Sequence, residues 1–279
     1  MRLGGRRSTN IEDRRGMGGP LMAGGGIGAV VIALIVMFMG GDPNVVLQQP
    51  ASQPGQQRQT TPEEDAQAEF VADVLGETEA SWAAIFQNQV GRAYQPPTLV
   101  LFTDAVQSEC GVGQAAMGPF YCPLDQKVYL DLGFFNELDQ RFGAPGDFAR
   151  AYVVAHEVGH HVQTLLGISQ EVQAARSRAS TEEGNALSVR QELQADCFAG
   201  LWARHANEQR QILEPGDVEE GLEAASAIGD DTLQRQTQGR VVPESFTHGS
   251  SAQRVEWFKR GLNSGEIAQC DTFRASGRF

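Results

Sequence analysis

The chain is short of histidine and of positive charge. It has 5 histidines, and its 22 Lys and Arg residues are outnumbered by 35 Asp and Glu residues, which gives a formal net charge of −13. A protein that binds nucleic acid needs a basic surface to meet the phosphates, so this balance argues against nucleic acid as a partner. Hydrophobic residues make up 41% and charged residues 20% of the 279 residues, as in an ordinary globular protein.

Cysteine is scarce as well, with four residues and no Cys-x-x-Cys pair. The usual thiolate zinc sites are therefore excluded. An even number of cysteines outside the cytoplasm indicates disulfides instead. Three pairings are possible. We favour a bond between Cys110 and Cys122, which flank a hairpin-like excursion, and one between Cys197 and Cys270, which would tie a helix to the C-terminal tail.

Charged residues are absent from residues 16–41. The apolar centre of that run, residues 21–39, is close to the roughly twenty residues that cross a bilayer as a helix. A cleaved signal peptide also has a basic front and an apolar middle, but this run is too long for one, and no small-x-small cleavage site follows it. Five arginines lie in residues 1–15 and an acidic chain follows the run, so the positive-inside rule predicts a cytoplasmic N-terminus.

The chain therefore divides into four predicted parts. They are a cytoplasmic basic tail at 1–20, a transmembrane anchor at 21–41, a disordered linker at 42–61 and a folded domain at 62–279. The linker is rich in Gln, Pro, Ser and Thr and has too few apolar residues to fold. This division predicts a single-pass protein of the cell membrane whose folded domain lies in the periplasm or the extracellular space.

The folded domain is predicted to be α+β, mainly helical with a small sheet. Buried strands are expected at 98–102 and 127–132. Thr61 should cap a helix that begins at Pro62, and Asp147 should cap one that runs to about Leu166. The other expected helices lie at 134–142, 169–178, 188–207, from 217 onward and at 250–262, with a polar loop through Asn185.

The helix expected from Asp147 carries the motif His-Glu-x-x-His. Residues four apart lie on one face of a helix, so His156 and His160 present their imidazoles to the same point. Two converging imidazoles are half of a zinc site, and Glu157 lies one position around the helix, where it can act on a metal-bound water. Three of the 5 histidines fall in residues 156–161, which makes a chance match improbable.

A catalytic zinc ion usually has three protein ligands and one open position. A third histidine six residues after His160 is excluded, because that residue is Leu166, and Gln163 replaces the glycine that this pattern requires. Glu192 and Asp196 are one turn apart on a later expected helix with apolar surroundings. We expect Glu192 to bind zinc and Asp196 to accept a hydrogen bond from a ligand imidazole, with Asp196 as the alternative third ligand.

Taken together, these segments resemble the neutral zinc metallopeptidases, a family of YpfJ-like proteins. The resemblance covers nearly the whole chain. It rests on Arg6 to Ser8, Asn10 to Gly16, the apolar run, Phe120 to Pro123, the His156 motif, Glu192 to Asp196, and Phe246 to Arg254. The family looks like a branch of the gluzincins, zincin-like peptidases in which a glutamate from a second helix is the third ligand. The resemblance thus implies Zn²⁺ as cofactor and supports Glu192.

The segment around His248 also resembles, more loosely, the Ser-Thr-His-Pro segment with a downstream arginine in the CAAX-prenyl and HtpX-like membrane proteases. Here Gly249 replaces the proline. This resemblance implies that His248 donates to the oxyanion of the transition state and that Arg254 braces an acid such as Asp196. A capping histidine in a loop is the equally weighted alternative. His161 and His205 are expected to be structural.

The resulting hypothesis is a membrane-anchored zinc metalloendopeptidase that acts on peptides or proteins. The strand that ends near Leu132 would lie beside the site and pair with an extended substrate. The alternative is a membrane-tethered binding or scaffold module with a non-catalytic zinc ion. A structural zinc ion is closed by four protein ligands, and the sequence offers no good fourth one.

Overall fold

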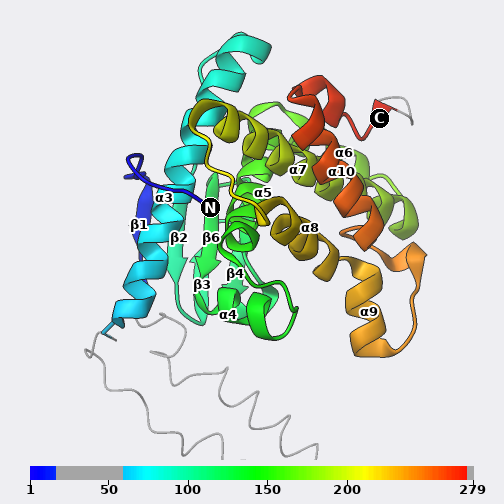
Figure 1. The fold of residues 1–279 in the computed structure, drawn as a ribbon. Coiled ribbons are helices and arrows are strands. Elements are labelled where there is room, and N and C mark those ends of the chain that lie inside the picture. The colour runs from blue at the N-terminus through cyan, green and yellow to red at the C-terminus, as the bar shows by residue number, and fades with distance from the viewer. Residues whose placement is uncertain (17–58, 275–279) are drawn as a thin grey trace, which may run out of the picture.

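The computed structural model describes residues 1–16 and 59–274. The helices in these ranges are α3 (Pro62–Ile85), α4 (Gly133–Gln140), α5 (Asp147–Leu165), α6 (Ile168–Arg176), α7 (Thr181–Arg210), α8 (Asp217–Ala227), α9 (Asp230–Gln238) and α10 (Ser251–Ser264). The strands are β1 (Ile11–Asp13), β2 (Thr98–Phe102), β3 (Ala105–Ser108), β4 (Gly111–Gln114), β5 (Phe120–Cys122) and β6 (Lys127–Asp131). The described part is thus mainly helical with a small sheet, as the sequence predicts (Figure 1).

The main sheet has the strand order β1-β2-β6-β5. Strands β1, β2 and β6 run parallel, whereas β5 runs antiparallel to β6 and pairs Phe120 with Tyr129. Strand β6, which ends just before Leu132, therefore has a neighbour on both sides. The expectation that it pairs with a substrate is wrong, because within the described part of the chain β5 is the outer strand at that end of the sheet.

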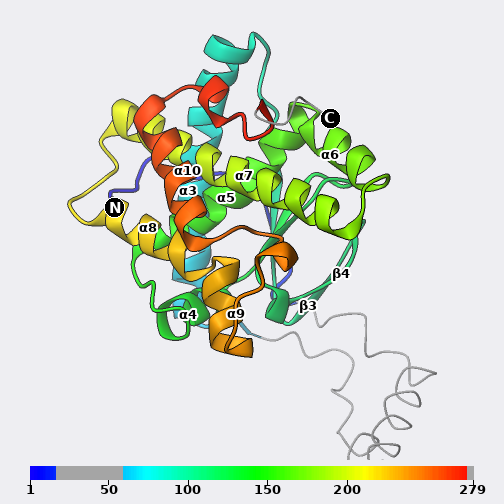
Figure 2. The same cartoon turned by 90° about the vertical axis from the view of Figure 1, so that its right-hand side faces the viewer.

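The hydrophobic core lies between the sheet and the helices. Figure 1 shows β1 beside α3 at one side of the molecule and α7, α8 and α10 at the other, with α5 between them. Figure 2, turned by 90°, shows the β3–β4 hairpin below α6 and α7. The largest fully buried side chains include Trp82, Phe86, Tyr129, Phe135, Phe148, Tyr152, Phe198, Trp202 and Phe258. Helix α5 is therefore enclosed on most of its surface, and its motif residues are held in fixed positions.

The membrane anchor predicted at residues 21–41 lies outside the described residues. Within the described ranges, no helix combines the length and the apolar character that a membrane span requires. Residues 1–15, which the sequence assigns to a tail in front of the anchor, contribute β1 to the main sheet.

Side chains at the helix starts explain several boundaries. The polar loop expected through Asn185 is wrong, because Ser180 and Glu183 form a capping box that satisfies backbone N–H groups and starts α7 at Thr181. Helix α3 begins at Pro62 with a capping box on Thr61, as expected. Asp147 is the first residue of α5 rather than its cap, and the Phe148 N–H donates to the Glu220 carboxylate of α8 at 3.1 Å.

Both disulfides have the pairing favoured from the sequence. The first joins Cys110 to Cys122 and so ties the β3–β4 turn to β5. The second joins Cys197 in α7 to Cys270 near the C-terminus. No cysteine is free in the described residues, which include all four.

Helices α7 and α10 approach each other so closely that their backbones touch at two glycines. A Cβ atom at Gly200 would lie 2.0 Å from the Phe258 carbonyl oxygen, and one at Gly261 would lie 1.9 Å from the Cys197 carbonyl oxygen. Any side chain at these positions would push the helices apart. The close approach therefore fixes the helix that carries Glu192 against the helix that carries Arg254.

We expect Gly200→Ala to lower the free energy of unfolding by about 1–3 kcal/mol or more, because backbone atoms of α10 cannot give way. Gly184→Ala in the same helix is the matched control. A Cβ atom there meets nothing within 4 Å. That change should be neutral or stabilise the protein by up to about 1 kcal/mol, since alanine loses less backbone entropy than glycine on folding. Urea unfolding of both variants measures the difference, and equal midpoints would contradict the steric explanation.

Candidate active site

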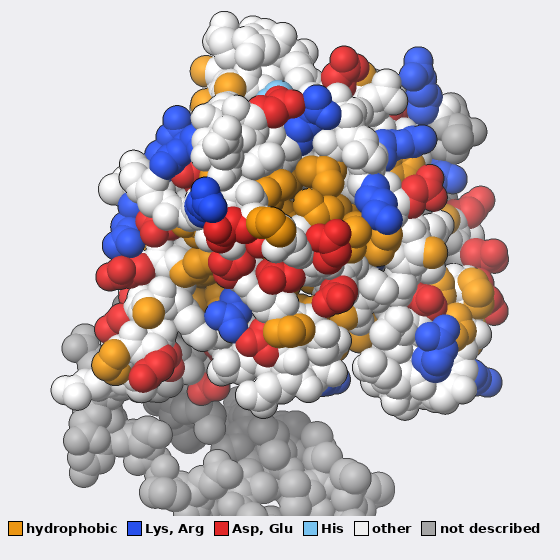
Figure 3. Space-filling model, viewed as in Figure 1, with side chains coloured by type: hydrophobic (Ala, Val, Ile, Leu, Met, Phe, Trp, Pro, Cys, Tyr) orange, Lys and Arg blue, Asp and Glu red, His pale blue; other side chains and the backbone are white. Residues whose placement is uncertain are grey.

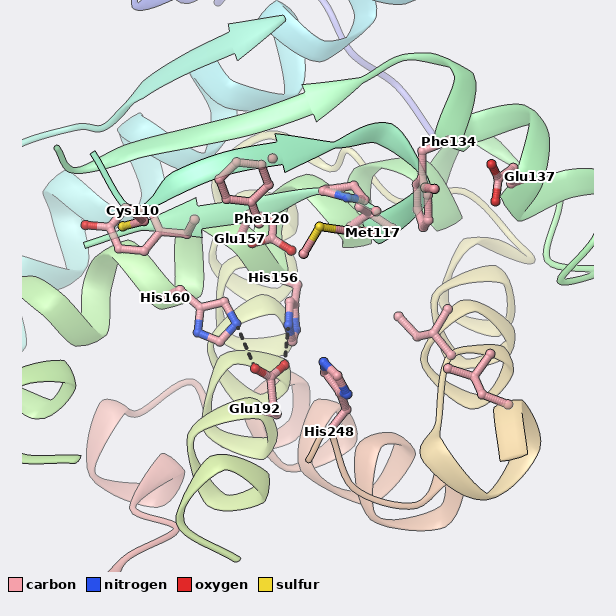
Figure 4. Close-up of a pocket in the computed structure, with 18 of the residues that line it drawn as sticks. Cys110, Met117, Phe120, Phe134, Glu137, His156, Glu157, His160, Glu192 and His248 are labelled. Atoms are coloured by element: carbon pink, nitrogen blue, oxygen red, sulfur yellow. Dashed lines mark hydrogen bonds and ion pairs between the residues drawn. The ribbon is translucent and has the colours of Figure 1, made fainter. Parts of the chain in front are cut away.

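Helices α5 and α7 bring together the three side chains that the sequence assigns to zinc. The Nε2 atom of His156 lies 3.1 Å from Oε2 of Glu192, and the Nε2 atom of His160 lies 3.4 Å from Oε1 (Figure 4). One ligand atom from each residue falls within 4.8 Å of the other two. Two imidazole nitrogens and one carboxylate oxygen form a donor set that suits zinc. The residues present therefore fit the metal that the motif implies.

Asp196 lies on the other side of the His156 ring. Its Oδ1 is 2.8 Å from the Nδ1 atom of His156, so the carboxylate accepts a hydrogen bond from Nδ1–H and leaves Nε2 free to bind a metal. Arg254 donates from Nε and Nη2 to the two carboxylate oxygens, both at 2.9 Å, and the Tyr152 hydroxyl also donates to Oδ1. Asp196 is thus a fully buried and fully occupied acceptor. This geometry favours Glu192 over Asp196 as the third ligand.

His160 has a corresponding partner that the sequence reasoning missed. Its Nδ1 atom lies 2.9 Å from Oε1 of Gln163, one turn further along α5. The Gln163 amide nitrogen donates to the Gln191 carbonyl at 2.7 Å and to Oε1 of Gln194 at 3.0 Å, which turns its oxygen toward the histidine. Gln194 in turn donates to the Cys270 carbonyl at 2.9 Å. Buried partners on α7 and α5, Asp196 and Gln163, therefore hold the two imidazole rings so that their Nε2 atoms face Glu192.

The charges around the site favour a cation. Burial alone would lower the pKa of His156, but Asp196 and Glu192 outweigh it and raise this pKa to about 10. Burial likewise opposes ionisation of Glu192, yet the two histidines hold its pKa well below the usual range. Burial raises the pKa of the Glu157 carboxyl, and the histidines oppose this only in part. A raised carboxyl pKa suits a group that takes up and returns a proton.

His248 lies in the loop before α10 and lines the same cleft as the two motif histidines (Figure 4). Its backbone N–H donates to Oδ2 of Asp230 at 2.6 Å, and its Nδ1 atom lies 3.3 Å from Oδ1. The side-chain hydrogen bond with Asp230 raises the pKa of this imidazole. The side chain of His248 is 53% exposed, so a substrate can reach it. Asp230, at the start of α9, is a second residue that sequence reasoning missed.

The site opens into a cleft of about 700 Å³. One wall comes from β4, the β4–β5 connection and β5, and the others come from α4, α5, α7, α9 and the loops that flank α9. Apolar side chains that are partly or fully exposed dominate the lining: Val112, Met117, Phe120, Phe134, Phe142, Ile228 and Leu233. Figure 4 shows Met117 and Phe120 beside Glu157, at the upper edge of the site. The cleft can therefore hold a chain segment that carries bulky apolar groups.

Two contacts fix the position of β5, which forms one wall of the cleft. The Phe120 ring stacks on Tyr129 with 4.8 Å between centroids, and it fills the space that a side chain at position 113 would need. The bond between Cys110 and Cys122 fixes the hairpin to the same strand. The sequence indicated this wall through the hairpin-like spacing of the two cysteines and through the segment from Phe120 to Pro123, on which the resemblance partly rests.

The remaining histidines have structural partners. His161 is buried, with its Nε2 atom 2.7 Å from the Gln95 carbonyl oxygen and its Nδ1 atom 3.1 Å from the Tyr121 hydroxyl. The Nε2 atom of His205 lies 3.0 Å from the Gly265 carbonyl oxygen. Neither residue is among those that line the cleft beside His156, His160 and Glu192. Figure 3 shows acidic side chains mixed with basic and apolar ones over one face of the molecule.

Comparison with known proteins agrees with the geometry. The family described as "Putative neutral zinc metallopeptidase" matches residues 1–273. The "Uncharacterized protein YpfJ" of Escherichia coli is 50% identical over 288 residues, which cover 99% of this chain and 100% of the relative. An uncharacterized protein of Mycobacterium tuberculosis is 45% identical over 193 residues, or 66% of this chain and 64% of that protein. No solved structure matches.

Proposed function

Because the chain belongs to the neutral zinc metallopeptidase family, we propose that it hydrolyses peptide bonds at the His156, His160 and Glu192 site. The observation that carries this proposal is the combination of two aimed imidazoles and one carboxylate with a buried acid, Glu157, on the same helix. Three ligands leave a position open for water and substrate, as in catalytic rather than structural zinc sites.

Each residue of the proposed site has its own role in the reaction. His156, His160 and Glu192 would hold a zinc ion, which would supply a Lewis acid that lowers the pKa of a water molecule toward neutrality. Glu157 accepts the proton of the attacking water and then donates a proton to the leaving amine. Asp196 and Gln163 keep the two imidazoles in the tautomer and orientation that ligation requires. His248, held by Asp230, donates to the oxyanion that develops on the scissile carbonyl.

A substrate is proposed to bind as an extended chain along β5. This strand is the outer strand of the described sheet beside β6, and its residues Phe120 and Tyr121 line the cleft. Backbone groups on its outer edge could pair with a peptide there. Phe120 on β5 and Met117 just before it then contact the substrate side chains next to the scissile bond. Peptides with bulky apolar residues at that place are the substrate class that this lining favours.

Two disulfides support an extracytoplasmic location for the peptidase domain, since such bonds persist in oxidising compartments. Attachment to a membrane through residues 21–41 remains a proposal from the sequence. Metal analysis of the purified full-length chain together with a quenched-peptide assay tests the function. One zinc ion per chain and hydrolysis that a chelator abolishes and zinc restores would support it. Stoichiometric zinc without hydrolysis of any peptide in a diverse library would favour a binding module.

We expect Met117→Ala to lower kcat/KM about tenfold for peptides with a bulky apolar residue beside the scissile bond, in line with the value of one apolar contact in a substrate pocket. Peptides with a small polar residue at that place should be cleaved at the wild-type rate. Met117 is 74% exposed and Leu124 is 71% exposed, but only Met117 lines the cleft. Leu124→Ala is therefore the control, and it should leave kcat/KM unchanged for both classes of peptide. A uniform effect on both peptide classes would contradict a specificity role.

We expect His248→Gln to lower kcat about 10²-fold with little change in KM, because a donor to a developing oxyanion acts in the transition state. The side chain is half exposed, so the protein should fold and keep its zinc. Steady-state kinetics and metal analysis measure both properties. An unchanged kcat would show that His248 only caps the loop through Asp230.

A further inference from the structure

Residues 1–15 are built into the peptidase domain through their backbone. Strand β1 lies parallel to β2 with Ile11 opposite Leu99 and Asp13 opposite Leu101. Hydrogen bonds continue beyond the strand, from the Ser8 N–H to the Ala72 carbonyl at 3.0 Å and from the Arg14 N–H to the Leu101 carbonyl at 2.8 Å. The segment therefore forms part of a sheet rather than resting on a surface.

Helix α3 is shaped to receive this segment. A Cβ atom at Gly76 would lie 2.4 Å from the Arg6 carbonyl oxygen and 3.0 Å from the Ser8 backbone nitrogen, so only glycine permits the approach. Glu79 on the same helix accepts hydrogen bonds from the Ser8 hydroxyl at 2.6 Å and from the Asn10 amide at 2.8 Å. Backbone contact and side-chain contact thus fix the same stretch of the segment.

Every arginine of the segment is paired with a carboxylate. Arg15 is only 6% exposed and donates to Asp13 at 2.6 Å and Asp65 at 3.1 Å. The other four pairs are Arg2 with Glu214, Arg6 with Glu77, Arg7 with Asp73 and Arg14 with Glu12. The positive-inside rule counts basic residues near a membrane span and gives little weight to acidic ones. Here the acids of the folded chain neutralise the charges that the rule counts.

We propose that residues 1–15 are a permanent part of the peptidase fold and face the same side of the membrane as residues 59–274. A chain that crossed a membrane once between residues 16 and 59 would separate β1 from β2 and break all the contacts above. Residues 16 and 59 must therefore lie on the same side. This differs from the topology that the arginines alone predict, in which the N-terminus is cytoplasmic and the domain is not.

Cysteine labelling of the full-length protein in spheroplasts tests the topology. Thr9 in the segment and Lys259 in α10 are both exposed and far apart in the fold, and the native cysteines are all paired. Thr9→Cys and Lys259→Cys should react alike with a membrane-impermeant maleimide, either both in intact spheroplasts or both only after lysis. Wild-type protein gives the background. Labelling of Lys259→Cys in intact spheroplasts with protection of Thr9→Cys until lysis would overturn the proposal.

A second measurement tests whether the segment is docked. Gly76→Ala should expel residues 6–8 from α3, and trypsin should then cut after Arg6 or Arg7 at least tenfold faster than in the wild type. Gly184→Ala, where a Cβ atom meets nothing within 4 Å, is the matched control and should keep the wild-type cleavage rate. Equal and fast cleavage of all three proteins would show that the approach to α3 does not protect the segment, and would overturn its docking.

Discussion

Glu157→Gln should reduce peptide hydrolysis by about 10²–10⁴-fold, the range that a general acid–base group contributes, while the protein keeps one zinc ion per chain. Glutamine has nearly the same shape as glutamate but cannot take up a proton from the attacking water. Its amide also fits the position of a side chain that is only 8% exposed. Zinc content by elemental analysis and kcat/KM with a quenched peptide measure the two properties separately.

The control for this change is Glu137→Gln. Glu137 lines the same cleft from α4, where it pairs with Arg141 at 3.3 Å, and it has no contact with the metal ligands. Its replacement should leave kcat within about twofold, because an exposed ion pair contributes little. If Glu157→Gln retained wild-type hydrolysis, the proposed mechanism would be wrong. Loss of zinc from the Glu157→Gln variant would instead make Glu157 a structural part of the metal site.

Glu192→Ala should yield protein that no longer binds zinc at equimolar concentration and that lacks activity. The carboxylate is one of the three proposed ligands, and its loss would leave the two imidazoles alone. Asp196→Asn acts differently, because it weakens only the partner of one imidazole. We expect it to lower zinc affinity by about 10–100-fold, the usual effect of changing an outer partner.

Competition with a chromophoric chelator measures both zinc affinities. Asp196 also neutralises the buried Arg254, so its replacement should lower stability, and the titration must be made on folded protein well below the unfolding temperature. Circular dichroism verifies the fold in each case. If Asp196→Asn lost zinc and Glu192→Ala kept it, Asp196 would be the third ligand and the roles of the two acids would be exchanged.

Much of the site could be predicted because it depends on spacing within a helix. His156 and His160 are four positions apart in the sequence, and so are Glu192 and Asp196. Each spacing places two side chains on one face of a helix. The chemistry of the site then points to an acid as the third ligand, since a metal held by two imidazoles needs an anionic ligand. The longer strands and most helices could also be predicted from the sequence, because their apolar patterns extend over five or more residues.

The features that sequence reasoning missed depend on contacts between distant segments. Gln163 carries no signal as a partner of His160 until α7 turns its amide with the Gln191 carbonyl. Strand β1 has three residues, two of them acidic, and no apolar pattern of its own, so only its place beside β2 makes it a strand. The first turn of α7 reads as a polar loop because its stability comes from the capping box on Ser180.

Strand β1 also has a consequence for self-association. It covers the outer edge of β2, whose sequence Thr-Leu-Val-Leu-Phe is apolar and almost wholly buried. If residues 1–58 were removed, the backbone groups of that edge would be unpaired and could template pairing with a second molecule. A three-residue strand with two acids, by contrast, discourages further pairing. A truncated chain that begins at Pro62, where the sequence places the start of the domain, should therefore aggregate, and soluble protein should require the first fifteen residues.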